Sequence, residues 1–256
     1  MIKCNYVINL ERRKDKWNSF ETDKNKTVLR NEQFIRFRAF DGYDYENEIK
    51  RCNLEDHIIF RFMKKERMSV AKGVLGCLIS HVALLNEIVN NQDILEDDYI
   101  GIYEDDIFYC NNFDKKYEEF KKINLKDLDI EFLYLGGRFA ADFDCRKSPD
   151  FNNMFEKTTN PDIIKRKNMV YRNFNWDRGT FSYIVKKSIC KKLINIISTT
   201  FVKKEGGRIR FEAIDYVYTC AFDKIKMFDY LPHLFYSLVN FNSDIQGDNL
   251  QKIIQF

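Results

Sequence analysis

The stretch that most constrains the fold of this chain is an apolar helix pattern followed by a short apolar strand that ends in three acids. Apolar residues recur at three- and four-residue steps over Gly73–Val89, which predicts an amphipathic helix. Residues 99–103 then form an apolar run typical of a buried strand, and Glu104, Asp105 and Asp106 follow it directly. Because adjacent carboxylates repel one another, three of them at the end of a buried strand need a neutralising partner. A hard divalent cation, often one that carries a phosphate, is the commonest such partner.

Strand and helix patterns alternate along most of the chain. Beyond the central pair, we expect strands at 6–10, 34–40, 132–137, 181–185, 225–231 and 234–239, helices at 11–23, 113–123, 188–197 and 212–222, and polar loops at 140–175 and 203–211. This alternation predicts an α/β fold with a mixed, mostly parallel sheet flanked by helices. The chain has 256 residues, 45% of them hydrophobic, and no internal repeat, so we expect a single domain over 1–256.

Composition limits the classes of function. The formal net charge of +3 argues against a dedicated nucleic-acid binder. The seven cysteines stand singly, without Cys-x-x-Cys, so neither a disulfide framework nor a zinc site is indicated and a reducing compartment is expected. No run approaches the roughly 18 apolar residues of a membrane span, and the first apolar stretch precedes its charges, unlike a signal peptide. We therefore expect a cytoplasmic protein without an integral membrane segment.

The acid triplet stands where open α/β sheets bind ligands, beyond the carboxyl end of a strand. In an enzyme that acts on a nucleotide sugar, Asp106 would ligate Mn²⁺ or Mg²⁺, and the metal would carry the diphosphate. Glu104 and Asp105 would hydrogen-bond the ribose hydroxyls. Acidic turns are common, so a solvated turn is the alternative interpretation.

Other candidate side chains lie elsewhere in the chain. Asp215 stands in an apolar helical stretch, where a half-buried carboxylate can act as a general base; a carboxylate on a solvated face is the alternative. His81, beside Ser80, is interpreted first as a helix histidine that is hydrogen-bonded within the fold. His233 follows Pro232 at a strand end and could complete a metal shell, or be a lone loop histidine.

Taken together, these pieces resemble glycosyltransferase family 25. This family contains bacterial lipopolysaccharide and lipooligosaccharide glycosyltransferases and collagen galactosyltransferases, with relatives in giant viruses. The most specific piece is a Gly-x-x-Gly-Cys-x-x-Ser-His helix followed about twenty residues later by a strand and Glu-Asp-Asp. The matching pieces are Tyr6–Arg13, Arg38–Gly42, Lys72–His81, Ile102–Asp106, Gly179–Val185, Ile214–Asp215 and Ser243–Ile245. The short chain is similar to the single-domain bacterial or giant-virus type, for which the host cytoplasm or viral factory would be the compartment.

The resemblance implies a GT-A type fold, a divalent metal, and inverting transfer of a hexose. The implied donor is a UDP-sugar, UDP-galactose or UDP-glucose, and the implied acceptor is a glycan or protein hydroxyl. It implies Asp215 as the base, and Asp106 with Glu104 at the metal, with His233 and Asp244 as rivals for completing the shell. Nucleotide or site-lining contacts are implied for Asn9, Arg12, Arg13, Asp41, Ser80, His81, Glu104 and Asp105.

One departure from the family pattern leaves alternatives open. Val74 stands where family members often carry an acid, so a catalytically silent relative that binds a nucleotide or a glycan is the first alternative. Another metal-dependent nucleotide enzyme would use the acid triplet alone and would leave the other pieces unexplained. The sequence defines neither the acceptor nor the oligomeric state, because acceptor pockets are built largely from loops.

Overall fold

The architecture was obtained from a computed structural model. It describes residues 2–52, 72–137, 155–156, 169–172, 180–200, 202–205, 208–211, 213–221, 224–231 and 233–237. All statements on the structure below concern these residues.

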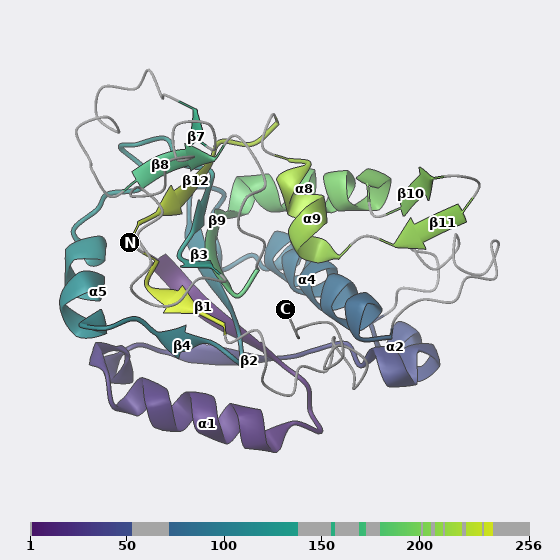
Figure 1. Ribbon diagram of the computed structural model, residues 1–256, viewed down its shortest axis with the longest axis horizontal. Helices are drawn as coiled ribbons and strands as arrows, with labels where there is room; N and C mark the ends of the chain where they lie inside the picture. The colour runs from purple at the N-terminus through teal and green to yellow at the C-terminus, as the bar shows by residue number, and fades with distance from the viewer. Residues whose placement is uncertain are drawn as a thin grey trace, which may run out of the picture.

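A mixed eight-stranded sheet of the described residues forms the centre of the fold (Figure 1). The strands follow the order β2 (Phe34–Arg38), β1 (Ile2–Asn9), β3 (Tyr99–Glu104), β9 (Ser182–Lys186), β5 (Phe132–Tyr134), β12 (Met227–Tyr230), β8 (Met169–Arg172) and β7 (Phe155–Glu156). Strand β9 is antiparallel to β3 and β5, and β8 is antiparallel to β12 and β7, whereas β2, β1 and β3 are mutually parallel and β5 is parallel to β12. The other six strands therefore share one direction, which confirms the predicted α/β fold with a mixed, mostly parallel sheet.

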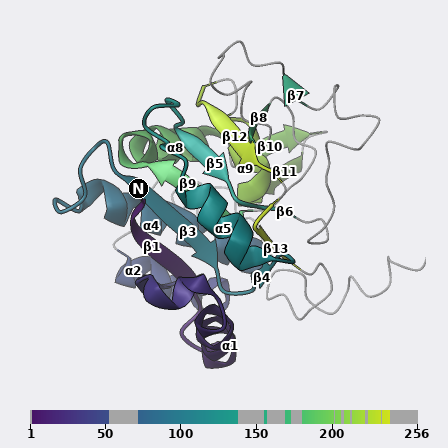
Figure 2. The ribbon, with the colours of Figure 1, turned by 90° about the vertical axis from the view of Figure 1, so that its left-hand side faces the viewer.

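Helices cover both faces of this sheet (Figures 1 and 2). Helices α4 (Lys72–Asn90), α8 (Lys187–Thr200) and α9 (Ile214–Thr219) lie on one face, and α1 (Lys14–Asn25) and α5 (Phe113–Lys121) lie on the other. Leu78 of α4 joins Ile100 of β3 in one buried cluster, whereas Tyr117 of α5 joins Val7 of β1 in another. Side chains alternate across each strand, so a single sheet supplies both hydrophobic cores.

Shorter elements complete the described fold. They are η1 (Val28–Asn31), η2 (Gly42–Asp44), α2 (Tyr45–Arg51), the hairpin of β10 (Val202–Glu205) and β11 (Arg208–Phe211), and a small sheet of β4 (Phe108–Tyr109), β13 (Phe235–Tyr236) and β6 (Gly136–Gly137). In the small sheet β13 is antiparallel to β4 and parallel to β6.

Two predicted loops contain strands. Within 140–175, β7 and β8 extend the main sheet beyond β12, and strands of two and four residues are too short for a period-two pattern to reveal them. Within 203–211, residues of β10 and β11 pair in antiparallel fashion, with Glu205 opposite Arg208. Two strand-like runs separated by Gly-Gly are a hairpin signal that outweighs the polar composition of the segment.

Helix α4 confirms the helix predicted over Gly73–Val89. Among the described helices it is the one that is long and apolar enough to cross a membrane by length and composition, but 56% of that apolar window is buried inside the protein. Leu78, Ile79 and Leu85 have no exposed surface. Helix α4 therefore has the burial expected of a core helix, and a core helix satisfies the same criteria of length and composition as a membrane span.

Two glycines determine where α4 lies. A Cβ atom at Gly42 would lie 1.8 Å from the carbonyl oxygen of Lys72, and a Cβ atom at Gly76 would lie 3.0 Å from the backbone nitrogen of Gly42. The backbones of η2 and α4 therefore approach so closely that no side chain fits between them. The two glycines are therefore packing positions of η2 and α4.

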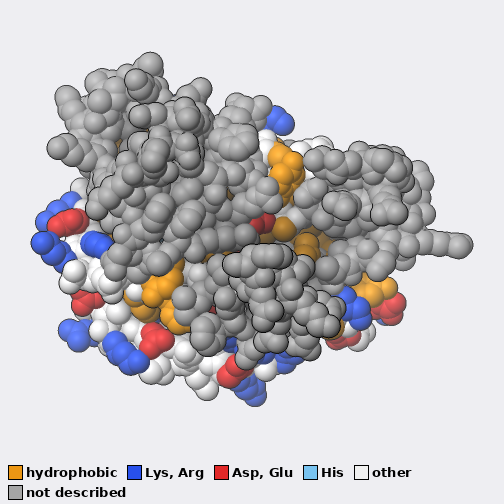
Figure 3. All heavy atoms as spheres, in the orientation of Figure 1, with side chains coloured by type: hydrophobic (Ala, Val, Ile, Leu, Met, Phe, Trp, Pro, Cys, Tyr) orange, Lys and Arg blue, Asp and Glu red, His pale blue; other side chains and the backbone are white. Residues whose placement is uncertain are grey.

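The surface charges of the described residues are mixed in sign. Figure 3 shows acidic and basic side chains interspersed along the rim of one face. This arrangement matches the near cancellation of charge in the sequence.

Candidate active site

The carboxyl ends of β1, β2 and β3 meet at one edge of the main sheet. The strand register pairs Ile8 with Glu104 and Asn9 with Arg38. The antiparallel strand β9 begins at the same edge, where the amide of Glu104 donates a hydrogen bond of 2.9 Å to the carbonyl oxygen of Phe181. The acid triplet therefore lies where ligands of open α/β sheets bind.

A cavity of about 100 Å³ lies over this edge. Seven predicted site residues line it: Arg12, Asp41, Ser80, His81, Glu104, Asp105 and Asp106. Cys77 and Tyr43 line it as well, and the sequence analysis assigned neither of them a role. The tertiary structure thus brings together residues from β1, η2, α4 and β3.

Asp106 is the acid whose surroundings most favour a cation. Its Oδ1 atom is buried and has no hydrogen-bond partner among the described residues. Burial, with the charges of Glu104 and Asp105, raises the pKa of Asp106 to about 7. A buried carboxylate oxygen without a partner, next to two further carboxylates, fits a hard divalent cation, which prefers oxygen ligands.

Asp105 is held by Asn9. The Nδ2 atom of Asn9 donates to Oδ2 of Asp105 at 2.5 Å and to the carbonyl oxygen of Arg13 at 3.1 Å. Its Oδ1 atom accepts a hydrogen bond of 2.8 Å from Nε of Arg36. Burial, reinforced by the charge of Glu104, raises the pKa of Asp105 to about 6. Asn9 is 1% exposed, and we infer that its role is to orient the carboxylate of Asp105.

Glu104 is held from two sides. The hydroxyl of Thr180 donates to its Oε1 atom at 2.7 Å, and Nε2 of His81 lies 3.4 Å from the same oxygen. The Nδ1 atom of His81 lies 2.8 Å from the hydroxyl of Tyr183, which lies 3.1 Å from the hydroxyl of Tyr218. His81 is fully buried, and these contacts confirm the interpretation of a histidine that is hydrogen-bonded within the fold.

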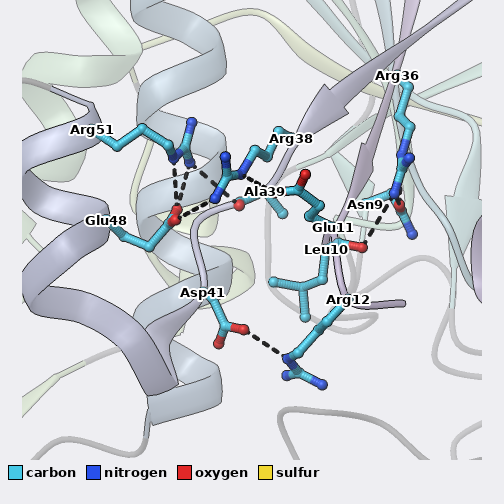
Figure 4. A network of polar contacts seen from close by, with 10 residues as sticks. All are labelled: Asn9, Leu10, Glu11, Arg12, Arg36, Arg38, Ala39, Asp41, Glu48 and Arg51. Carbon is cyan, nitrogen blue, oxygen red and sulfur yellow. Dashed lines mark hydrogen bonds and ion pairs between the residues drawn. The ribbon is translucent and has the colours of Figure 1, made fainter. Parts of the chain in front are cut away.

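Arg12 and Asp41 form the outer rim of the cavity (Figure 4). The Nε atom of Arg12 lies 2.7 Å from Oδ2 of Asp41, and Oδ1 of Asp41 accepts a hydrogen bond of 3.0 Å from the amide of Tyr43. The guanidinium of Arg12 lies 5.7 Å from the ring centre of Tyr43, whose side chain is 57% exposed. The rim therefore presents a cation, an acid and an aromatic face next to the buried acids.

Figure 4 also shows a second ion cluster, near the pair formed by Arg12 and Asp41. Glu48 of α2 is nearly buried and accepts hydrogen bonds from Arg38 at 3.0 Å and from Arg51 at 2.5 Å. These bonds join α2 to the end of β2. They stabilise the segment that carries Asp41, so the cluster is structural.

Two predicted contact residues are engaged in packing. The hydroxyl of Ser80 donates to the carbonyl oxygen of Gly76 at 2.7 Å and accepts from the amide of Phe40 at 2.8 Å. Ser80 therefore joins α4 to the end of β2, although it also lines the cavity. The guanidinium of Arg13 lies 2.9 Å from Asp15 at the start of α1. Nucleotide contacts for these two residues remain predictions.

Asp215 is not among the described residues that line the cavity. It is partly buried in the first turn of α9, where its Oδ1 atom accepts a hydrogen bond of 2.9 Å from the amide of Tyr216. Burial is the main cause that raises the pKa of the Cys77 thiol, and the charges of Glu104, Asp215 and Asp106 add to it. Asp215 thus contributes to the electrostatics of one cavity residue, Cys77, and its role as the base remains a prediction.

The structure does not bring His233 to Asp106. His233 lies 3.4 Å from Oδ1 of the fully buried Asp229. In the antiparallel β4–β13 pair Tyr236 lies opposite Phe108, and the amide of Cys110 donates to the carbonyl oxygen of Leu234. The Tyr236 end of the pair is therefore the one nearer to Asp106, whereas His233 lies beyond the opposite end. Among the predicted ligands, Asp244 lies outside the described residues.

A sequence profile of glycosyltransferase family 25, described as an LPS biosynthesis protein family, matches residues 2–216. The match begins in β1 and ends in α9, just after Asp215. The chain belongs to glycosyltransferase family 25. This family member is therefore a glycosyltransferase, with a sugar donor and an acceptor as substrates. The curated proteins include no match to it. The profile match ends before His233 and Asp244.

Besides Tyr43, three residues that build this site were missed by sequence reasoning. Cys77 stands four residues before His81, a spacing that places both on one face of a helix and could have indicated a shared site. Thr180 and Tyr183 belong to a matched family piece, but their contacts with Glu104 and His81 join segments about 80 to 100 residues apart. No local pattern reports such a contact.

Proposed function

We propose that this glycosyltransferase moves a hexose, galactose or glucose, from a UDP-sugar to a hydroxyl group of a glycan or protein. The proposal includes a GT-A type fold, a divalent cation, Mn²⁺ or Mg²⁺, and inversion at the anomeric carbon. The observation that carries it is the buried Oδ1 atom of Asp106, which has no hydrogen-bond partner within the described part of the chain and lies beside Glu104 and Asp105 at the carboxyl end of β3.

The residues around the cavity fit a nucleotide sugar and its cation. Asp106 and Glu104 would hold the cation, which when bound would neutralise charge on the leaving diphosphate. Asp105, oriented by Asn9, would accept hydrogen bonds from the ribose hydroxyls. The exposed ring of Tyr43 offers a stacking face for the uracil base, and Arg12 adds positive charge next to it.

Asp215 would supply the base for the transfer. As the acceptor oxygen attacks the anomeric carbon, the carboxylate of Asp215 takes the hydroxyl proton. A carbon–oxygen bond to the acceptor forms while the carbon–oxygen bond to the diphosphate breaks on the opposite side of the carbon, so the configuration inverts. The position of Asp215, partly buried and electrostatically coupled to the cavity wall, supports this role.

A donor-turnover assay tests the proposal. UDP release is measured from UDP-galactose and UDP-glucose with Mn²⁺, with Mg²⁺ and with a chelator. We expect release from at least one donor, lost with the chelator, and lost in Asp106→Asn but kept in Asp97→Asn, an exposed acid paired with Lys186.

Three results would separate the alternatives. UDP binding without turnover across a broad acceptor panel would identify a silent binding relative. Release that is unaffected by the chelator would remove the metal from the proposal. No binding of UDP or of any UDP-sugar would overturn the assignment of the donor.

A further inference from the structure

Cys77, His81 and Glu104 form a cluster that the proposed transfer does not use as a unit. One ligand-type atom from each residue, the thiol sulfur, a ring nitrogen and a carboxylate oxygen, lies within 4.8 Å of the other two. Cys77 and His81 are one helical turn apart on α4, and Glu104 ends β3. We propose that this cluster is a second metal site, for Zn²⁺ or a similar thiophilic divalent ion.

The distance between His81 and Glu104 supports coordination. Their Nε2 and Oε1 atoms are 3.4 Å apart, which is long for a hydrogen bond. If each of the two atoms binds zinc at about 2.0–2.1 Å, a separation of 3.4 Å between them corresponds to a ligand–zinc–ligand angle of about 110°. This is close to the tetrahedral angle. The thiol sulfur lies within 4.8 Å of both atoms, so it would have to approach by at most about 1 Å to reach a zinc–sulfur bond of about 2.3 Å, a movement within the reach of a side-chain rotation.

The outer contacts of the cluster are those of a metal site. The Nδ1 atom of His81 is fixed by the hydroxyl of Tyr183 at 2.8 Å, which leaves Nε2 facing Glu104. The hydroxyl of Thr180 holds Oε1 of Glu104 at 2.7 Å. Metal-bound histidines and carboxylates commonly have such outer partners, which orient the ligands.

The charge of the cluster also suits a cation. A thiolate and one carboxylate neutralise a divalent ion, so the loaded site adds no net charge to a buried region. Asp106, whose Oδ1 atom accepts no hydrogen bond from any residue that the structure describes, lines the same cavity and adds negative potential. Because all three ligands line this cavity, the fourth coordination position is open to water or substrate, as in catalytic rather than structural zinc sites.

This site differs from the cation site proposed at Asp106. A thiolate selects zinc or cobalt over manganese and magnesium, whereas Asp106 offers only oxygen. The two sites share Glu104. Closely spaced cysteines, the usual sequence signal of a zinc site, are absent from the sequence, whereas these ligands come from a helix and a strand that only the fold brings together.

Cobalt titration of the metal-free protein tests the proposal, because Co²⁺ bound to a thiolate absorbs in the near ultraviolet. We expect one equivalent of Co²⁺ to produce this charge-transfer band and Zn²⁺ to displace it. Cys77→Ser should lose the band, and Cys4→Ser, which removes another partly exposed thiol, should keep it. Tyr183→Phe should weaken cobalt affinity about tenfold, because His81 loses its orienting hydroxyl.

A second measurement uses the unmodified chain and so avoids any folding defect of a variant. Alkylation of each cysteine by iodoacetamide is followed by mass spectrometry, and Zn²⁺ should slow the reaction at Cys77 but not at Cys4. A band that persists in Cys77→Ser, or alkylation of Cys77 that zinc leaves unchanged, would overturn the site.

The outcome is independent of the proposed transfer. Asp106→Asn should keep the cobalt band while it loses Mn²⁺-dependent UDP binding. A cobalt band without any UDP binding in the wild-type chain would leave the zinc site standing and would remove the UDP-sugar donor. UDP binding without the band would do the reverse.

Discussion

Strand β1 carries two buried asparagines, and they face very different surroundings at its two ends. Asn5, near the start, donates to Oε2 of Glu32 at 3.4 Å, and the hydroxyl of Tyr117 donates to the same oxygen at 2.8 Å. Residues of this end line a cavity of about 630 Å³. Asn9, at the other end, holds Asp105 beside the smaller cavity of about 100 Å³.

The two cavities differ in electrostatics as well as in volume, and the proposed function uses the smaller one. At the large cavity the carboxylate of Glu32 already receives two hydrogen bonds from the fold. At the small cavity three acids adjoin, the pKa values of Asp105 and Asp106 are raised, and one oxygen has no partner among the described residues. Buried carboxylates with raised pKa values indicate a ligand site better than cavity volume does.

The largest expected difference between the two ends concerns turnover. Asp215→Asn should lower the kcat of hexose transfer by about 10²–10⁴-fold, because the acceptor proton loses its base. UDP affinity, measured by calorimetry, should stay within about threefold of the wild-type value, since the proposed base does not touch the nucleotide. Glu32→Gln at the large cavity serves as the control and should keep its kcat. A kcat for Asp215→Asn near that of the wild type would exclude it as the base.

Stability should depend on pH through the small cavity. The folded-state pKa values of about 6 for Asp105 and about 7 for Asp106 exceed those of free aspartate, so the folded chain binds protons more tightly than the unfolded chain does. The metal-free protein should therefore lose stability as the pH rises from about 4 to 7. At pH 8, Asp106→Asn should raise the free energy of unfolding by about 1–3 kcal/mol.

Thermal unfolding with a chelator, at pH 5.5 and pH 8, measures this effect. Saturating Mn²⁺ should stabilise the wild type but not Asp106→Asn, because cation binding replaces the missing counter-charge. A lower Tm for Asp106→Asn than for the wild type at pH 8 would contradict the assignment.

The two asparagines themselves give a smaller and more direct comparison. Asn9→Ala should weaken Mn²⁺-dependent UDP binding about tenfold, because Asp105 loses the group that orients it. Asn5→Ala should leave UDP affinity unchanged, although both variants should lose about 1–2 kcal/mol of stability from a broken buried hydrogen bond. Equal UDP affinities in the two variants would mean that Asn9 is only structural.

The smallest expected effect lies at the rim of the small cavity. Tyr43→Ala should weaken UDP binding by about fivefold, close to 1 kcal/mol, because a stacking face for the base is removed. Tyr45→Ala is the matched control, since Tyr45 is another exposed tyrosine two residues away whose hydroxyl bonds Glu46. If both variants bind UDP equally well, the base does not stack on Tyr43.

Local patterns predicted the longer elements of the fold well. The helix over Gly73–Val89 and the strand at 99–103 match α4 and β3 closely, because their periodicity is strong and spans several turns or a complete strand. Strands β7, β8, β10 and β11 were placed in loops, since short strands are defined by their neighbours in a sheet rather than by their own residues.

The same limit applies to the site. Glu104, Asp105 and Asp106 could be identified because adjacent acids after an apolar strand are unusual in one short window. The contacts of Thr180 with Glu104 and of Tyr183 with His81 could not be, because they join β9 to β3 and α4 across the sheet. The sequence left His233 open between a metal ligand and a loop histidine, and in the fold its ring lies 3.4 Å from Asp229, which precedes it by four residues.

The sequence alone determined the α/β class, the family pieces and the acid triplet, because periodicity and adjacency are properties of a linear chain. The tertiary structure decided which acids are buried, which partner each of them has, and that Cys77 and His81 of α4 lie against Glu104 of β3. The physical reason is that desolvation and coordination depend on distances between segments far apart in sequence. Those distances exist only after the sheet has paired and α4 has packed against η2 through Gly42 and Gly76.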